Sequence, residues 1–319
     1  MLILTGGAGF IGSCFLAALN AAGREDVLVV DSLGSGHKWK NLVGKKFIGI
    51  VGKEDFLEML GTEDLDEVDA VVHMGACSST TETDADYLYS NNYLYSIDVA
   101  EFALERNARF IYASSAATYG NGEQGYLDAS VDLRPLNMYG YSKHLFDLWI
   151  RNQGLAESCV GLKFFNVFGP NEYHKDAMCS MVFKAVEQIR TTGHVQLFKS
   201  TDPAYGDGMQ ARDFIYVKEV CDVMMRLLGA PQINGIVNLG TGKARTWNDL
   251  VNAVFAAMGV ESNIVYTDMP NEIATQYQNY TQADMTTLLQ LLPDVHFREL
   301  ESTVADYVSG YLLNKQPYL

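Results

Sequence analysis

The sequence predicts a doubly wound α/β fold, in which helices flank a parallel sheet and a smaller α/β cap is attached. Two observations support this prediction. Apolar, strand-like runs alternate with helical patterns from residue 1 to about residue 168, and such alternation is typical of βαβ units. The first run also leads at once into a glycine-rich turn at 6–12, which is the usual beginning of a Rossmann fold.

The elements follow in order along the chain. Strands are expected at 1–5, 26–31, 46–50, 69–75, 109–115, 159–166 and 235–240, and helices at 10–22, 53–61, 91–107, 139–153 and 178–192. After residue 168 the alternation breaks, and the tail carries a helix near 246–258, a strand near 263–267 and a last helix near 300–313. We therefore expect a Rossmann domain for NADP at 1–168 and 214–240, and a substrate-binding domain at 169–213 and 241–319.

The glycine turn predicts a dinucleotide site. Its spacing at Gly6, Gly9 and Gly12 allows a tight turn and lets the backbone approach a pyrophosphate. The helix that follows offers its N-terminal amides to the phosphates. Asp31 ends the second strand, nineteen residues after Gly12, where a carboxylate binds a ribose hydroxyl.

Tyr139 and Lys143 stand four residues apart, so a helix places them on one face. A phenol has a reference pKa of about 10, and a nearby ammonium lowers that pKa toward the working range of a base. Ser115 ends the strand 109–115, where its hydroxyl faces the ligand crevice and orients a substrate hydroxyl toward Tyr139. The small residues at 74–78 end another strand and suit a backbone that passes over the cofactor.

Composition excludes several classes of function. The chain has 319 residues, 48% of them hydrophobic, and a net charge of −16, which argues against a nucleic-acid surface. No run of eighteen apolar residues exists and a strand begins at residue 1, so we expect neither a membrane span nor a signal peptide. Five scattered cysteines without a Cys-x-x-Cys pair indicate reduced, cytoplasmic thiols. The six histidines form no His-x-x-x-His pair, so we expect no metal.

These motifs together resemble the extended short-chain dehydrogenases/reductases. Longer stretches resemble the ADP-L-glycero-D-manno-heptose 6-epimerases within the NAD-dependent epimerase/dehydratase family, and they lie at 75–82, 112–120, 137–143, 165–175, 212–217 and 281–284. The resemblance implies inversion of carbon 6 in ADP-D-glycero-D-manno-heptose by transient oxidation and re-reduction with bound NADP. This reaction serves lipopolysaccharide inner-core biosynthesis.

The resemblance also implies roles for individual residues. Tyr139 and Lys175 serve as alternate acid/bases, Lys143 holds the nicotinamide ribose, and Ser115 contacts the substrate. The implied cofactor positions are Gly6, Gly9, Phe10, Ile11, Gly12, Asp31, Ser32, Lys38, Lys53, Met74, Gly75, Ala76, Cys77, Ser78, Asn91, Lys143, Val167 and Lys175. The implied substrate positions are Ser115, Asn166, Ala177, Lys184, Phe198, Lys199, Ser200, Thr201, Arg212 and Tyr277.

The chain departs from the family pattern in three places. Ala177 stands where a hydroxyl residue is expected, and Lys184 stands where a histidine is expected. The loop 200–211 is longer than usual, which leaves the adenine contacts of 198–201 open.

The sequence contains opposing indications for NAD and for NADP as the cofactor. Asp31 alone favours NAD, because a carboxylate repels a 2′-phosphate. A basic stretch follows it, with His37, Lys38, Lys40, Lys45, Lys46 and Lys53. The family matches Lys38 and Lys53 with NADP contacts, so we expect NADP.

Other functions stay open. A UDP-hexose 4-epimerase shares the fold, Tyr139 and Lys143 but does not need Lys175. A 4,6-dehydratase is disfavoured because Ala116 and Ala117 stand where an acidic pair is expected. A non-catalytic Rossmann module commonly lacks the Tyr/Lys pair. Family members form homo-oligomers, including a pentamer, and the sequence does not set the number.

Overall fold

The computed structural model describes all 319 residues except 63–64, 66, 271–273 and 275–276. Its centre is a seven-stranded sheet in the order β10-β6-β5-β4-β1-β2-β3, and every neighbouring pair is parallel. The strands are β1 (Leu2–Thr5), β2 (Val27–Val30), β3 (Gly49–Val51), β4 (Ala70–His73), β5 (Arg109–Ser115), β6 (Cys159–Phe164) and β10 (Gly235–Leu239). The doubly wound fold is thereby confirmed. Strand order reverses between β1 and β4, and ligands bind at such a reversal.

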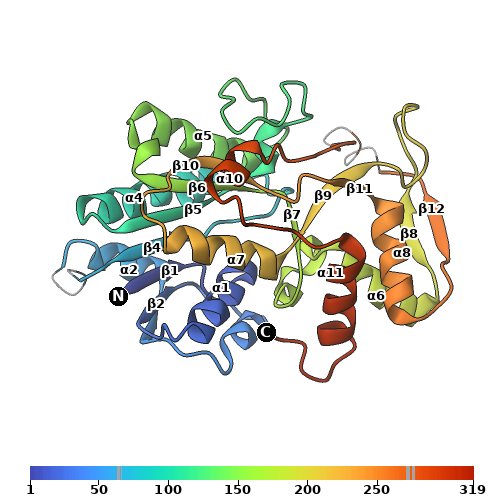
Figure 1. The fold of residues 1–319 in the computed structure, drawn as a ribbon, viewed down its shortest axis with the longest axis horizontal. Helices are drawn as coiled ribbons and strands as arrows, with labels where there is room; N and C mark the ends of the chain where they lie inside the picture. Colours follow the sequence, from blue (N-terminus) through green and yellow to red (C-terminus); the bar gives the residue numbers. More distant parts are fainter. Residues whose placement is uncertain (63–64, 66, 271–273, 275–276) are drawn as a thin grey trace.

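Helices cover both faces of this sheet (Figure 1). On one face α1 (Phe10–Ala21) and α7 (Val217–Leu228) share an apolar cluster with Leu2 and Leu4. On the other face α4 (Tyr95–Glu105) and α5 (Met138–Asn152) share a second cluster with Ile3. Because successive side chains of a strand point to opposite faces, a strand buried on both sides is mostly apolar, as in β2 throughout and in β1 and β4 up to their last residues, Thr5 and His73.

A smaller part of the chain lies at the carboxyl ends of the central strands, at the right of Figure 1. One of its sheets joins β7 (Asn166–Phe168), β9 (Ala211–Tyr216) and β11 (Ala244–Thr246). The other pairs β8 (Val195–Phe198) with β12 (Ile264–Thr267) in parallel. The helices α6 (Met181–Thr192), α8 (Trp247–Met258) and α11 (Leu300–Tyr307) pack with them.

Several predicted elements differ in extent. The expected strand 159–166 is divided, because β6 ends at Phe164 and β7 joins another sheet. The expected helix 91–107 starts earlier, as α3 (Ala85–Leu88) and a π-helical turn (Tyr89–Leu94) precede α4. The expected helix 178–192 begins at Met181, after a 3₁₀ turn (Tyr173–Met178). The structure adds the helices α7 and α10 (Thr286–Leu291), and the helix at 53–61 is α2 (Lys53–Met59).

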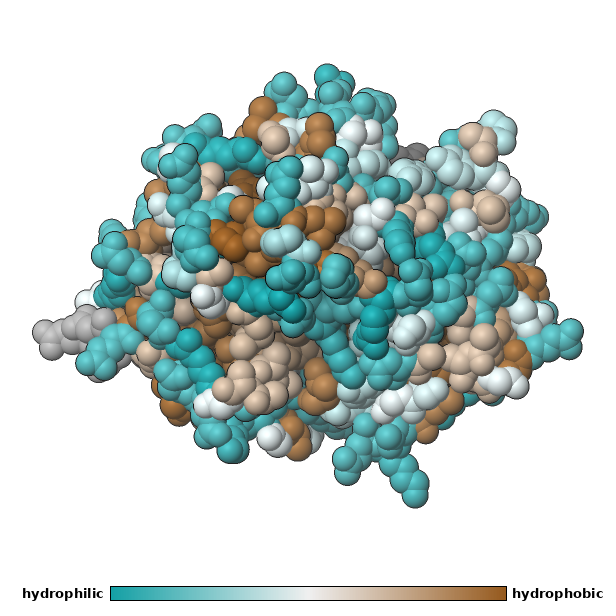
Figure 2. All heavy atoms as spheres, in the orientation of Figure 1, coloured by the Kyte–Doolittle hydropathy of each residue, from teal (hydrophilic) through white to brown (hydrophobic). Residues whose placement is uncertain are grey.

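The surface in Figure 2 is mostly hydrophilic on the face that it shows. Hydrophobic side chains gather in one area above and left of the centre, where Figure 1 places α10. Within the part of the chain that the structure describes, no helix has the length and apolar character to cross a membrane.

Candidate active site

A cavity of about 810 Å³ lies where the central sheet meets the smaller part of the chain. Its lining includes most predicted cofactor positions: Gly6, Gly9, Phe10, Ile11, Gly12, Asp31, Lys38, Met74, Gly75, Ala76, Ser78, Lys143, Val167 and Lys175. It also includes Tyr139 and Ser115, and the predicted substrate positions Asn166, Lys184, Phe198 and Tyr277. The structure therefore brings the proposed acid/bases and the glycine turn to one pocket.

The glycine turn forms a cradle that only glycine fits. Gly6 has a φ of +66°, and its carbonyl accepts a hydrogen bond from the Gly9 amide at 2.9 Å. A Cβ on Gly12 would lie 2.2 Å from the Gly6 oxygen, and a Cβ on Gly6 would lie 2.6 Å from the Gly75 nitrogen. Helix α1 has no side-chain cap and no acidic residue in its first turn, which leaves its first amides open to an anion. The residues present fit a dinucleotide pyrophosphate.

Asp31 is held by three neighbours. Its Oδ2 accepts from the Ala8 amide at 2.9 Å, and its Oδ1 accepts from the Ser32 amide at 2.7 Å. Lys38 donates its Nζ to the same Oδ1. The Asp31 carboxylate is therefore already paired with a cation at the pocket edge.

The basic stretch at 37–53, all of which the structure describes, does not gather at the pocket. Of its cationic side chains, Lys38 lines the cavity. Lys45 donates to the Leu319 carbonyl, Lys46 pairs with Glu25 at 2.5 Å, and Lys53 donates to Asn91 Oδ1 at 2.9 Å. The predicted cofactor positions Ser32, Lys53, Cys77 and Asn91 lie outside the lining.

Helix α5 presents Tyr139 and Lys143 to the pocket. Its N-cap, Asn137, accepts from the Gly140 amide at 2.8 Å through its side chain, and this cap fixes where the helix begins. Lys143 is 4% exposed, and its Nζ donates to the Ala113 carbonyl at 2.9 Å. Burial lowers the pKa of Lys143 to about 8, so the amine is mostly protonated at neutral pH.

The pKa of Tyr139 differs from the sequence prediction. Burial raises this pKa, a hydrogen bond with Ser115 lowers it, and Cys77 raises it. Lys143 points at the Ala113 carbonyl, and desolvation of the phenolate outweighs any help from its charge. The expectation that Lys143 lowers the pKa of Tyr139 is therefore not met by these residues alone.

Behind Lys143 lies a buried polar network that sequence reasoning missed. Asp147, four residues further on α5, pairs with Lys163 of β6 at 2.8 Å. Its carboxylate also accepts from Ser114 Oγ at 2.7 Å and from Tyr112 Oη at 3.0 Å. The charge of Asp147 raises the pKa of Lys143 against the larger, lowering effect of burial. The readable signal was a lysine inside an otherwise apolar strand, because a buried charge requires a partner.

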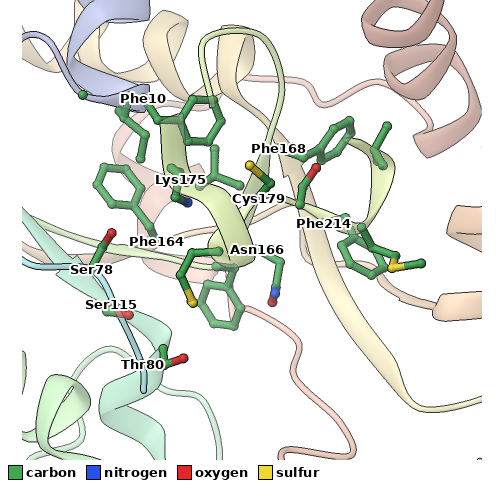
Figure 3. A pocket seen from close by; sticks show the side chains of 18 of the residues that line it. Phe10, Ser78, Thr80, Ser115, Phe164, Asn166, Phe168, Lys175, Cys179 and Phe214 are labelled. Atoms are coloured by element: carbon green, nitrogen blue, oxygen red, sulfur yellow. The ribbon is translucent and has the colours of Figure 1, made fainter. Parts of the chain in front are cut away.

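Lys175 reaches the pocket from another direction. It belongs to the 3₁₀ turn Tyr173–Met178 that follows β7, and its Nζ lies 5.3 Å from the centre of the Phe10 ring. Burial lowers the pKa of Lys175, the charge of Glu172 raises it, Cys179 raises it and Lys184 lowers it. Figure 3 shows Lys175 across the pocket from Ser78, Thr80 and Ser115. Thr80 lines the cavity but was not among the predicted positions.

The remaining predicted substrate positions lie outside the lining. The Ala177 carbonyl accepts at 2.6 Å from the Nζ of Lys184, which itself lines the cavity, and Lys199 pairs with Asp268 at 2.9 Å on the surface. The positions outside are Ala177, Lys199, Ser200, Thr201 and Arg212. The pocket wall there is instead largely apolar, with Leu197, Val182 and Leu250.

Arg212 is a special case because it lies just behind the lining. It is 6% exposed, and its guanidinium lies 5.7 Å from the ring of Trp247 and 5.0 Å from that of Tyr277. Both rings line the pocket. Among the described residues no carboxylate pairs with Arg212, whose Nη1 donates to the Ala211 carbonyl at 3.0 Å. The described residues also contain no cluster of His, Cys, Asp and Glu that could hold a metal ion.

The glycine cradle on a doubly wound sheet, with Tyr139 and Lys143 on one helix beside it, defines a Rossmann-fold enzyme of the short-chain dehydrogenase/reductase class. Comparison with known proteins narrows the class. The model of the "NAD dependent epimerase/dehydratase family" matches residues 2–240, and the chain belongs to this family.

Relatives and solved structures agree with this membership. The chain is 53% identical to the ADP-L-glycero-D-manno-heptose-6-epimerase of Nitratidesulfovibrio vulgaris, with all of both chains covered. It is 44% identical, again over all of both chains, to the protein of the same name from Fusobacterium nucleatum. The crystal structure of the Helicobacter pylori enzyme of that name is similar, with a TM-score of 0.83 and 29% identity over 97% of this chain and 95% of that one.

Proposed function

We propose that this enzyme inverts carbon 6 of the heptose in ADP-D-glycero-D-manno-heptose to give ADP-L-glycero-D-manno-heptose, with bound NADP, for the lipopolysaccharide inner core. One observation carries the proposal: Tyr139 and Lys175 line the same pocket from different elements. The epimers present their hydroxyls on different sides of the reacting carbon, so two acid/bases are needed. The names of the full-length relatives support the choice of sugar.

The cofactor would be held by residues of the Rossmann part. The glycine turn and the N-terminus of α1 would bind its pyrophosphate. Residues 74–78, which follow β4, would lie against the cofactor, and Lys143 would hold the nicotinamide ribose. When bound, the nicotinamide supplies hydride removal from carbon 6 and hydride return to it.

The protein's own residues move the proton and hold the sugar. Tyr139 Oη takes a proton from the hydroxyl of one epimer, and Lys175 Nζ does so for the other. A general acid/base works best when its pKa lies near the operating pH. Burial lowers the pKa of Lys175 toward that range, whereas burial raises the pKa of Tyr139 away from it. Ser115, beside Tyr139, orients the hydroxyl. Phe164 and Phe168 add apolar surface to the pocket wall.

We propose NADP as the cofactor because Lys38 stands at the pocket edge beside Asp31. Its ammonium offsets the carboxylate and can turn to a 2′-phosphate. This support is narrower than the sequence suggested, since Lys45, Lys46 and Lys53 are engaged elsewhere.

Arg212 is proposed to bind the diphosphate of the substrate through its guanidinium, and Phe198 and Tyr277 are proposed to contact the nucleoside of the substrate. We further propose that the enzyme works in the cytoplasm, as its scattered cysteines suggest, and that it forms a homo-oligomer, as the resemblance implies.

The proposal is tested by incubating the purified protein with ADP-D-glycero-D-manno-heptose and following the L-glycero epimer by proton NMR. Conversion is expected, and none is expected with UDP-glucose. Failure on the heptose together with conversion of UDP-glucose would replace the proposal with a 4-epimerase.

Variants test the two acid/bases. Tyr139→Phe and Lys175→Met should each slow epimerisation by about 100-fold or more while cofactor stays bound. Lys243→Met is the matched control, because Lys243 is exposed and pairs with Glu299 at 2.6 Å. Full activity in Lys175→Met would remove the second base from the account.

A further inference from the structure

Glu172 is a carboxylate sealed inside the protein, three residues before Lys175. It is 0% exposed. Its Oε2 accepts from the Ser180 amide at 2.5 Å, and its Oε1 accepts from Ser180 Oγ at 2.6 Å and from Tyr307 Oη at 3.0 Å. Among the described residues no lysine or arginine pairs with it within 4.0 Å. Burial of an ion without a paired cation is costly: burial raises the pKa of Glu172, and the hydrogen bonds from Ser180 and Tyr307 lower it in part.

These three hydrogen bonds join three separate segments. Glu172 follows β7, Ser180 is the N-cap of α6 and accepts from the Phe183 amide at 3.3 Å, and Tyr307 ends α11. The backbone of the turn also closes on Glu172, whose carbonyl accepts from the Lys175 amide at 3.0 Å and from Cys179 Sγ at 3.3 Å. The segment that carries Lys175 is therefore tied at both ends to one residue.

The turn needs such ties because it contains strained backbone. Asp176, directly after Lys175, has φ 46° and ψ −118°, a region that residues other than glycine rarely adopt. Strain of this kind persists only where the surroundings fix it. Figure 3 shows Lys175 on this turn near Phe10, and its Nζ lies 5.3 Å from the centre of the Phe10 ring.

We propose that Glu172 is a positioning residue, whose carboxylate latches the turn 172–180 and thereby holds the Lys175 amine over the reacting carbon. The inference rests on the proposed function of Lys175. The charged and titratable groups that act on Lys175 are Glu172, Cys179 and Lys184. Of these, only Glu172 both holds the turn through its hydrogen bonds and carries a negative charge that favours the protonated form of the Lys175 amine.

The first test is Glu172→Gln in the full-length protein with bound cofactor. A glutamine removes the negative charge, and its NH₂ cannot accept from Ser180 Oγ and Tyr307 Oη, so both hydroxyls would have to turn and accept instead. The expected result is a kcat about 10- to 100-fold lower, with KM and cofactor content within about twofold. The ionisation of Lys175 is identified in the pH profile of the wild type as the one that Lys175→Met lacks. In Glu172→Gln this ionisation should move to lower pH, because no carboxylate then favours the protonated amine.

Two further variants separate position from charge and from stability. Tyr307→Phe removes one donor but keeps the carboxylate, so kcat should fall severalfold while the Lys175 ionisation stays in place. Glu219→Gln is the matched control, because Glu219 accepts from the Arg298 amide at 2.8 Å and does not line the pocket. Its kcat and pH profile should match those of the wild type. If Glu172→Gln does not fold, Tyr307→Phe decides, and an unchanged kcat would overturn the proposal.

A measurement that does not depend on catalysis can test the role of Glu172 separately from the proposed epimerase activity. Competitive acetylation followed by mass spectrometry measures the pKa and reactivity of Lys175, with Lys243 as the internal reference. Altered Lys175 reactivity in Glu172→Gln supports the latch even if the wild type does not convert ADP-heptose. Wild-type kcat together with unchanged Lys175 reactivity would overturn it.

Discussion

His73 makes the stability of this enzyme sensitive to mild acid. It ends β4, is 1% exposed, and lies directly before the residues that floor the cofactor site. Its Nδ1 lies 2.6 Å from Thr5 Oγ1, and its Nε2 lies 2.9 Å from Ser96 Oγ. Burial, with a contribution from the charge of Lys143, lowers the pKa of His73 to about 3. The imidazole is therefore neutral in the folded protein.

The size of the effect follows from proton linkage. An unfolded histidine has a pKa of about 6.5, so the unfolded state binds a proton first as the pH falls. Stability from this group is present above pH 6.5 and is lost as the pH drops toward the folded pKa of about 3. At pH 5 the pH is about 1.5 units below the unfolded value, which corresponds to a loss of about 2 kcal/mol.

Urea unfolding of wild type and His73→Gln at pH 7.5 and pH 5.0, at one cofactor concentration, measures this loss. The wild type should lose about 2 kcal/mol more than the variant between the two pH values. Burial also lowers the pKa of His144 and of His174, but both are present in the two proteins and cancel in the difference. An equal loss in both proteins would refute the reasoning.

Three further predictions concern the cofactor site and the core. Lys38→Ala should weaken NADP binding by about 10-fold and leave NAD within about twofold, measured by isothermal titration calorimetry; equal weakening of both would argue against a 2′-phosphate contact. Gly12→Ala should abolish cofactor retention in the purified protein, because its Cβ would lie 2.2 Å from the Gly6 oxygen; a variant purified with full cofactor contradicts this. Asp147→Ala leaves Lys163 buried without its partner and should lower the free energy of unfolding by about 3–5 kcal/mol, whereas a loss under about 1 kcal/mol in urea unfolding would show that the pair is dispensable.

The sequence predicted the central sheet well because its signals are local. A strand such as β1, buried on both faces, is a continuous apolar run, and the glycine turn has a spacing that few other structures need. Helix α7 also had a readable signal that was not used: Val217, Val220, Cys221 and Met224 have helical spacing and are all buried.

The rest depended on contacts between distant parts of the chain. The partner of Lys45 is the carbonyl of Leu319, and one of the two residues that donate to the Glu172 carboxylate is Tyr307, 135 residues away. No local pattern reveals such pairings, so the basic stretch at 37–53 suggested a cluster that the fold disperses. The division of 159–166 between two sheets has the same origin, since β7 is selected by pairing with β9.

The central claim, that Tyr139 and Lys175 act on one carbon from different sides, is tested most directly by a crystal structure with NADP and ADP-heptose bound. Tyr139 Oη and Lys175 Nζ should each lie within about 3.2 Å of a position that the oxygen on carbon 6 occupies in one of the two epimers. A complex in which Lys175 contacts only phosphate, or lies away from carbon 6, would contradict it.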